Sequence, residues 1–233
     1  MLKDLHTLTP YLDFIRICNA DPDYRDPMLL TQQQLHRNLL DAPENPNTRV
    51  FGTFEGEAIT GVFALLVLED ERYLELLAGL SRSAAAYAEL LSHLKSAHPG
   101  YQADFVYNPR NRLLQEALAA LGAEFEPEQQ KLVLCRAVPY VPDARIVPYR
   151  PEYRAQYLAL HTVDRYWTGE KVLAAPEVFR VLLALEAGEA AGYIDLTHNS
   201  TENEPYDLFV REKSRRRGLG RALLAAAVQE NRP

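Results

Sequence analysis

The chain has 233 residues, of which 47% are hydrophobic and 24% charged, so it is long enough for one large domain or two small ones with a buried core. A formal net charge of −7 disfavours a general nucleic-acid or membrane-surface binder. The first residues lack a basic segment followed by an apolar run, and no apolar stretch of about 18 residues occurs, so neither a signal peptide nor a membrane span is expected. The two cysteines, Cys18 and Cys135, have no metal-type spacing and favour buried thiols in a reducing, cytoplasmic compartment.

The first half alternates helical and strand patterns. Apolar residues at helical spacing predict a helix over 2–19, and Thr31 is a helix cap for 31–40. Gly56 marks a tight turn between two strands. The remaining expected elements are strands at 49–54, 58–68, 73–79, 104–107 and 131–136, and helices at 83–97 and 111–121.

A proline-rich stretch, 138–151, separates this half from the next. Four prolines in this stretch predict a stiff, exposed connection, and we place the domain boundary here. The expected domains are 1–137 and 151–233, with 138–150 as a linker or first strand of the second domain.

The second half repeats the pattern of the first. A helix is expected over 151–163, followed by strand, turn, strand, a further strand ending at Val210, and a helix over 219–229. The turn segment 54–61 matches 185–192 within one residue, at an offset of about 132 that suits two copies of one domain. The second copy lacks the last strand, helix and strand of the first.

A loop near the end carries the clearest chemical pattern. The strand 206–210 leads into an arginine-rich loop with Arg215, Gly218 and Gly220 at fixed spacing, and a helix follows. Glycines let a backbone approach a ligand, and a helix start offers free N–H groups to an anion. A dinucleotide-binding fold would need glycine where Leu223 stands, and no P-loop pattern occurs. A nucleic-acid arm formed by residues 215–221 is a weaker alternative.

The Arg-x-x-Gly-x-Gly pattern after a strand-terminal valine resembles the acetyl-CoA-binding motif of the GNAT acyltransferase superfamily. The resemblance implies an α/β fold with a mixed sheet in two tandem GNAT-like domains, acetyl-CoA as co-substrate and no metal. It also implies cofactor-binding residues along the strand and loop: Leu208, Phe209, Val210, Arg215, Arg216, Arg217, Gly218, Leu219, Gly220 and Arg221.

Acyl transfer to an amine needs a base, because a protonated amine has no lone pair. Some family members carry a glutamate at the position of Glu204, and Asp207 lies nearer on the same strand. Tyr166 and Trp167 are the expected substrate-facing residues, with core packing as the alternative. His161 and His198 are expected to be ordinary surface or strand histidines.

The first half resembles the family's fifth strand and fourth helix at 108–122, but Leu118 stands where members often carry a thiolate-protonating tyrosine. It also lacks the glycine loop, so we expect a degenerate scaffolding copy. The whole pattern predicts an N-acetyltransferase acting on a primary amine of a small molecule or peptide. A non-catalytic acyl-CoA-binding pseudoenzyme or interaction module is the alternative. We expect neither nucleic acid nor membrane as a partner, and a homodimer remains open because a partner subunit could supply the missing strand.

Overall fold

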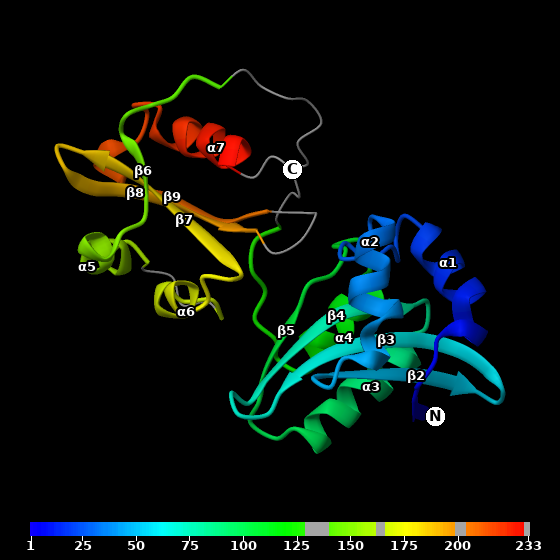
Figure 1. The fold of residues 1–233 in the computed structure, drawn as a ribbon. Helices are drawn as coiled ribbons and strands as arrows, with labels where there is room; N and C mark the ends of the chain where they lie inside the picture. Colours follow the sequence, from blue (N-terminus) through cyan, green and yellow to red (C-terminus); the bar gives the residue numbers. More distant parts are fainter. Residues whose placement is uncertain (129–139, 162–165, 199–203, 231–233) are drawn as a thin grey trace. The chain divides into compact units, whose positions relative to one another are not determined.

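The structure, a computed structural model, divides into two compact units (Figure 1). Each unit is a sheet with helices on both faces. The units are Met1–Lys131 and Leu132–Pro233, and the residues described are 1–128, 140–161, 166–198 and 204–230.

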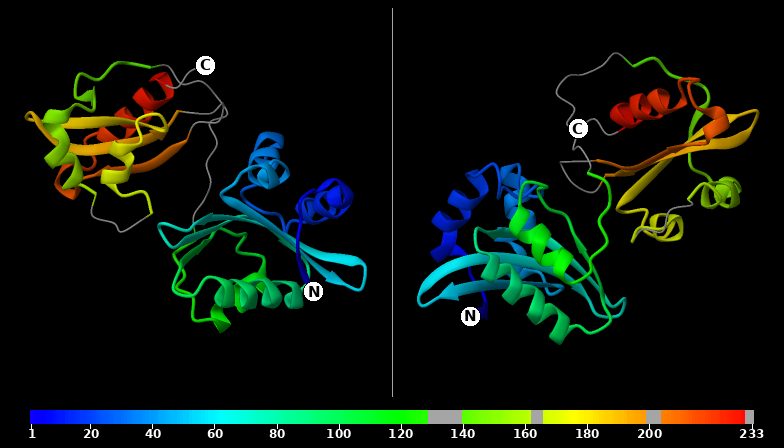
Figure 2. Two further views of the ribbon diagram at one scale, coloured as in Figure 1. Left: turned by 60° about the horizontal axis from the view of Figure 1, so that its bottom comes forward. Right: turned by 180° about the vertical axis from the view of Figure 1, so that it is seen from behind.

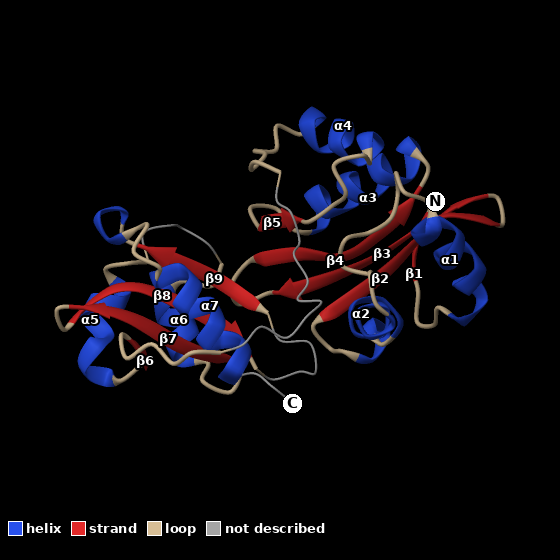
Figure 3. Cartoon of the chain, turned by 90° about the horizontal axis from the view of Figure 1, so that it is seen from above, coloured by secondary structure: helices blue, strands red, loops and turns tan. Residues whose placement is uncertain are grey.

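The sheet of the first unit has five strands in chain order, antiparallel except for the parallel last pair (Figure 3). Its strands are β1 (Leu2–Asp4), β2 (Thr48–Glu55), β3 (Ala58–Leu68), β4 (Tyr73–Ser81) and β5 (Gln102–Phe105). The β4–β5 pairing covers only the first part of β4, from Tyr73 to Leu76. The second part of β4, from Leu77 to Ser81, does not pair with β5; there the Gly79 N–H binds the Asp26 carboxylate instead.

Two helices cover each face of this sheet. The helices are α1 (Leu12–Ala20) and α2 (Gln32–Leu35) on one face, and α3 (Ala84–Ala97) and α4 (Arg112–Ala120) on the other. Thr31 caps α2 as predicted: its hydroxyl accepts the Gln34 N–H, and the Gln34 side chain accepts the Thr31 N–H. Asn111 caps α4: its side-chain oxygen accepts the Leu114 N–H. Short polar caps therefore fix where these helices begin.

The prediction of a single helix over 2–19 was wrong. Residues 2–4 form strand β1 at the edge of the sheet, with Leu2 opposite Thr53, and the helix begins only at Leu12 (Figure 2). Leu5 and Leu8 are buried all the same, because an extended chain and a short 3-10 turn carry them into the α1 face of the core. The predicted strand 131–136, together with Cys135, lies outside the described residues, whereas Cys18 is a buried free thiol.

The second unit has a four-stranded antiparallel sheet with α7 on one face and α5 and α6 on the other (Figure 1). The helix predicted over 151–163 is a 3-10 turn followed by the short α5. Across the residues that the structure describes, no helix is both long and apolar enough to cross a bilayer. The elements are β6 (Ile146–Pro148), α5 (Arg154–Leu158), α6 (Gly169–Ala174), β7 (Phe179–Glu186), β8 (Glu189–Thr197), β9 (Pro205–Val210) and α7 (Leu219–Glu230).

The two units contain the same hairpin, β2–β3 in the first and β7–β8 in the second. Both hairpins close through two residues and carry a register shift at the same place, where Thr53 pairs with Gly61 and Ala184 with Gly192. The two hairpins therefore have the same pairing and turns of the same length. The sequence comparison allows a difference of one residue in turn length. A Cβ on Gly192 would lie 2.6 Å from the Phe209 carbonyl oxygen, so only glycine allows this approach of the strands.

Candidate active site

The glycine loop joins the end of β9 to the start of α7. The Arg211 N–H extends the sheet by one bond to the Ala191 carbonyl, and a 3-10 turn over Glu212–Ser214 then reverses the chain. Arg216 and Gly218 have left-handed backbone, with φ of 63° and 83°. A Cβ at Gly218 would meet no atom within 4 Å, so the loop is open on that side.

The loop presents a run of unpaired backbone donors. Among the described residues, no acceptor binds the N–H groups of residues 216–220. The first helical N–H groups have no partner inside a helix, and Gly218 supplies only the first accepting carbonyl, to Ala222. Consecutive free N–H groups at a left-handed turn and a helix start form a concavity that suits an anion.

Two of the loop arginines fold back onto their own unit. Arg217 contacts the Glu186 carboxylate at 2.6 Å, and the Ser214 hydroxyl donates to its other oxygen at 2.7 Å. These contacts, from Ser214 first and Arg217 next, lower the pKa of Glu186 below its usual value. The Arg215 guanidinium donates to the Val210 carbonyl at 2.9 Å. Arg216 and Arg221 are exposed.

Glu186 is a residue that sequence reasoning missed. It is the last residue of β7, next to the β7–β8 turn, and it contacts Ser214 of the loop, 28 residues away in sequence. The sequence singled out this turn only as part of the repeat. The acidic residue at the matching place of the first unit, Glu55, is exposed, so a comparison of the two copies could not have revealed the contact.

The two carboxylates predicted as bases lie in different surroundings. Glu204 is exposed, and its backbone pairs with Thr197. Asp207 is half-buried on β9, and the Tyr193 hydroxyl donates to its Oδ2 at 2.6 Å. The structure thus brings Asp207, and not Glu204, into a network of polar side chains.

That network lies in the interior, on the α5 face of the sheet. Asp195 lies opposite Asp207 in the β8–β9 pairing, is fully buried, and accepts the Tyr157 hydroxyl at 2.9 Å. The His161 Nε2 lies 3.1 Å from its other oxygen, and 8% of the His161 side chain is exposed. Burial raises the pKa of Asp195, against the lowering effect of His161 and Tyr157. The prediction that His161 is an ordinary surface or strand histidine was therefore wrong.

The predicted substrate-facing aromatics are packed within the second unit. Trp167 is partly buried: it lies edge-to-face against Phe179, with ring centroids 4.8 Å apart, and packs against the core cluster beneath α5 and α6. Lys171 Nζ lies 3.8 Å from the centroid of the Tyr166 ring. His198 is half-buried, and its ring Nε2 lies 2.9 Å from the Pro176 carbonyl oxygen.

The first unit is built differently at the matching place. Only Arg82 and Ser83 join β4 to α3, where the second unit has residues 211–218. The loop 21–28 lies against the part of β4 that β5 leaves unpaired: the buried Asp26 carboxylate accepts the Gly79 N–H at 2.7 Å, and the Asn108 amide binds the Pro22 carbonyl. Burial raises the pKa of Asp26 to about 7.

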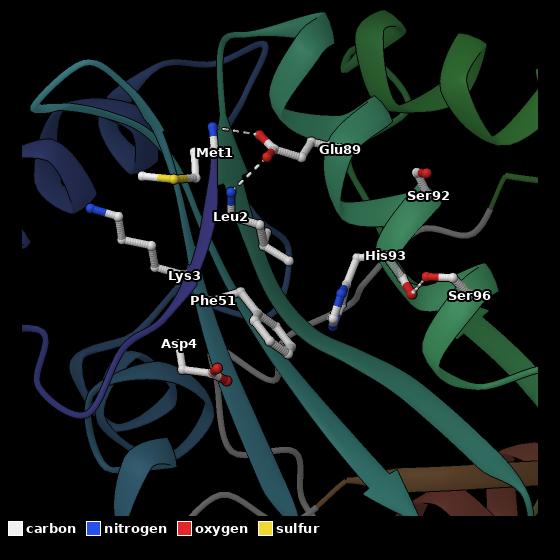
Figure 4. A pocket seen from close by; sticks show the side chains of 9 residues that line it. All are labelled: Met1, Leu2, Lys3, Asp4, Phe51, Glu89, Ser92, His93 and Ser96. Carbon is white, nitrogen blue, oxygen red and sulfur yellow. Dashed lines mark hydrogen bonds and ion pairs between the residues drawn. The ribbon is translucent and has the colours of Figure 1, made fainter.

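A hollow of about 430 Å³ lies elsewhere in the first unit, between β1 and α3 (Figure 4). Of its two carboxylates, Asp4 and Glu89, the second is already paired with the Met1 ammonium and the Leu2 N–H. None of the predicted site residues lines it. The unpaired donors of the glycine loop therefore define the candidate site better than the size of a hollow does.

Comparisons with known proteins concern part of the second unit and the fold of the chain. Residues 177–232 match the sequence model of the acetyltransferase (GNAT) domain family, while no curated protein matches the chain. A GCN5-related N-acetyltransferase from Sphaerobacter thermophilus shares 14% identity over 99% of this chain and 82% of its own, with a TM-score of 0.57. This likeness concerns the fold alone.

Two further solved structures are weaker matches. A tandem GNAT protein from the clavulanic acid biosynthesis pathway is 15% identical over 99% of this chain and 85% of its own, with a TM-score of 0.49. A protein from Thermus thermophilus is 20% identical over 41% of this chain and 76% of its own, with a TM-score of 0.31. Residues 177–232 of the second unit are thus similar in sequence to the acetyltransferase (GNAT) domain family, and the fold of the chain is similar to that of the Sphaerobacter N-acetyltransferase.

Proposed function

We propose that the second unit transfers an acetyl group from acetyl-CoA to a primary amine of a small molecule or peptide. The observation that carries this proposal is the run of unpaired N–H groups over residues 216–220, at the joint between β9 and α7. The pyrophosphate of coenzyme A is the anion that would accept these donors. Arg216 and Arg221 are exposed beside the loop and add positive charge.

Strand β9 would carry the rest of the co-substrate. It is the last strand of the sheet in the described residues, so its outer edge can pair with an extended amide chain such as pantetheine. Leu208, Phe209 and Val210 are only partly buried or exposed along this strand. The thioester carbonyl would then accept an N–H near Val210, close to Asp207 on the same strand.

Asp207 is the proposed proton acceptor. The amine nitrogen attacks the thioester carbonyl, its proton passes to Asp207 directly or through water, the carbon–sulfur bond breaks, and the coenzyme A thiolate takes a proton from solvent. A positioned base contributes about 10²–10⁴-fold. Asp207 suits this role better than Glu204 because the Tyr193 hydroxyl holds it in place, whereas Glu204 is exposed.

We further propose that the first unit has no acyl-CoA site. It has no counterpart of the long loop formed by residues 211–218 in the second unit. The Asp26 carboxylate already accepts the Gly79 N–H, on the strand that would pair with the co-substrate. The Leu118 side chain is buried in the core beneath α3 and α4, where it packs and carries no proton. The role of the first unit is then that of a scaffold.

The test measures acetyl-CoA binding by calorimetry and coenzyme A release over a broad panel of amines. We expect binding by the wild type and turnover with at least one amine. Asp207→Asn should lower the rate about 100-fold or more with unchanged acetyl-CoA affinity, whereas Glu204→Gln should have little effect. Binding without any turnover would favour the non-catalytic acyl-CoA-binding alternative, and absence of binding would contradict the proposal.

A further inference from the structure

Two buried polar atoms in the second unit face each other without forming a hydrogen bond. The His161 Nε2 and the Asp195 Oδ2 are 3.1 Å apart, yet neither has a hydrogen-bond partner among the described residues. Both side chains are more than nine-tenths buried. Buried polar groups normally form hydrogen bonds. The two unpaired atoms therefore indicate a bound group that interacts with both of them.

A third potential ligand comes from the neighbouring strand. Asp207 lies opposite Asp195 in the β8–β9 register, and one ligand atom from each of His161, Asp195 and Asp207 lies within 4.8 Å of the others. Three atoms from three segments thus surround one small volume.

The surroundings orient these atoms. Tyr157 donates to Asp195 Oδ1 at 2.9 Å, and Tyr193 donates to Asp207 Oδ2 at 2.6 Å. Each tyrosine thus holds one oxygen of a carboxylate. The Tyr193 ring also stacks on the His161 imidazole, with centroids 4.2 Å apart and planes at 15°. Outer groups that fix the direction of carboxylates and imidazoles in this way are typical of metal sites.

The first unit shows that the fold itself does not need this cluster. In the repeated strand pairing, Ala64 opposite Ala78 takes the place of Asp195 opposite Asp207. Both alanines are buried, as is Val62 at the place of Tyr193. An apolar core suffices there, and burying a carboxylate such as Asp195 is costly unless hydrogen bonds or a positive charge compensate it.

The direct contact between His161 and Asp195 does not satisfy either atom. The His161 Nε2 and the Asp195 Oδ2 are close enough for an ion pair, but the contact lacks the alignment of a hydrogen bond. A divalent cation between them would accept an electron pair from each and so satisfy both atoms.

We propose that His161, Asp195 and Asp207 bind one divalent transition-metal ion. One imidazole nitrogen with two carboxylates suits zinc, manganese or iron(II), whereas magnesium and calcium prefer oxygen ligands alone. This site was not expected from the sequence, which predicted no metal.

A bound ion would also act on catalysis. This consequence rests on the proposed function: a carboxylate coordinated to a dication is a weak base, so Asp207 cannot hold the ion and accept the amine proton at once. The metal would therefore inhibit acetyl transfer.

The test uses the full chain, treated with a chelator and dialysed. Calorimetric titration with zinc chloride and with manganese chloride should give one site per chain for at least one ion, and cobalt(II) should give visible d–d absorption bands. Asp195→Asn and His161→Gln should weaken binding strongly, since each replaces a good ligand by a neutral amide oxygen and keeps the size of the side chain. Tyr157→Phe should weaken binding about 10–100-fold by releasing Asp195. Glu189→Gln is the control, an exposed carboxylate on the same strand, and should bind like the wild type.

Chemical unfolding of each variant in chelator shows whether it is folded. Absence of binding by the wild type, or wild-type affinity in both folded Asp195→Asn and Tyr157→Phe, would overturn the site. The binding titration needs no turnover, so a chain that binds the ion but transfers no acetyl group contradicts only the proposed function. In a chain that does transfer it, the ion should slow turnover and chelator should restore it.

Discussion

Replacing Gly218 by leucine separates the ligand-binding role of the glycine loop from its backbone strain. Gly218 has φ of 83°, a conformation that costs a residue with a side chain about 1–2 kcal/mol. A matched control exists in the same unit: Gly188, in the β7–β8 turn, has φ of 84°. A Cβ at either position meets no atom within 4 Å. The unfolding free energy should therefore fall by the same amount in Gly218→Leu and Gly188→Leu.

Coenzyme A affinity should distinguish the two variants. A leucine side chain at Gly218 would occupy the space in front of the unpaired N–H groups of residues 216–220. A hydrogen bond to a charged group contributes about 1.5–3 kcal/mol, so losing two of them costs at least about 3 kcal/mol. The Kd of coenzyme A should then rise at least about 100-fold in Gly218→Leu and stay unchanged in Gly188→Leu.

Isothermal titration calorimetry with coenzyme A, together with chemical unfolding of both variants, measures these quantities. Wild-type coenzyme A affinity in Gly218→Leu would refute the assignment of the loop. An equal loss of affinity in Gly188→Leu would show that strain, and not the occupied space, is responsible.

Three further predictions concern other parts of the chain. The pKa of Asp26 is raised from 3.8 to about 7, so the folded chain holds a proton that the unfolded chain has lost; unfolding free energy should fall by about 4 kcal/mol as pH rises from about 4 to 7. Chemical unfolding at a series of pH values should show this fall in the wild type and not in Asp26→Asn, and equal slopes would contradict the reasoning. Glu186→Ala frees Ser214 and Arg217, and calorimetry should show coenzyme A affinity reduced by about two- to fivefold, since an exposed ion pair contributes little; unchanged affinity would argue that the loop holds its shape unaided. Limited proteolysis followed by mass spectrometry should cut first within 138–150, and resistance there would count against the proposed boundary.

The secondary structure of the chain follows largely from local sequence patterns. The hairpins formed by β2–β3 and β7–β8 are recognisable from apolar runs separated by turn residues, and the caps at Thr31 and Asn111 from short polar side chains before helices. The glycine loop could be predicted because its residues are contiguous: the end of the strand, the loop and the start of the helix all lie within 206–220.

The residues that complete the site could not be predicted from local sequence patterns. Residues 2–4 form a strand because they pair with the edge of β2, about fifty positions later in the chain. No local sequence pattern predicts this pairing. Glu186 reaches the loop only because the hairpin turn lies beside it. Asp195 and Asp207 oppose one another through the strand register, and His161 joins them from the segment after α5. The sequence alone thus determined the repeated hairpin and the position of the glycine loop between β9 and α7, whereas the tertiary structure decided which distant side chains meet, because strand pairing and helix packing set those contacts.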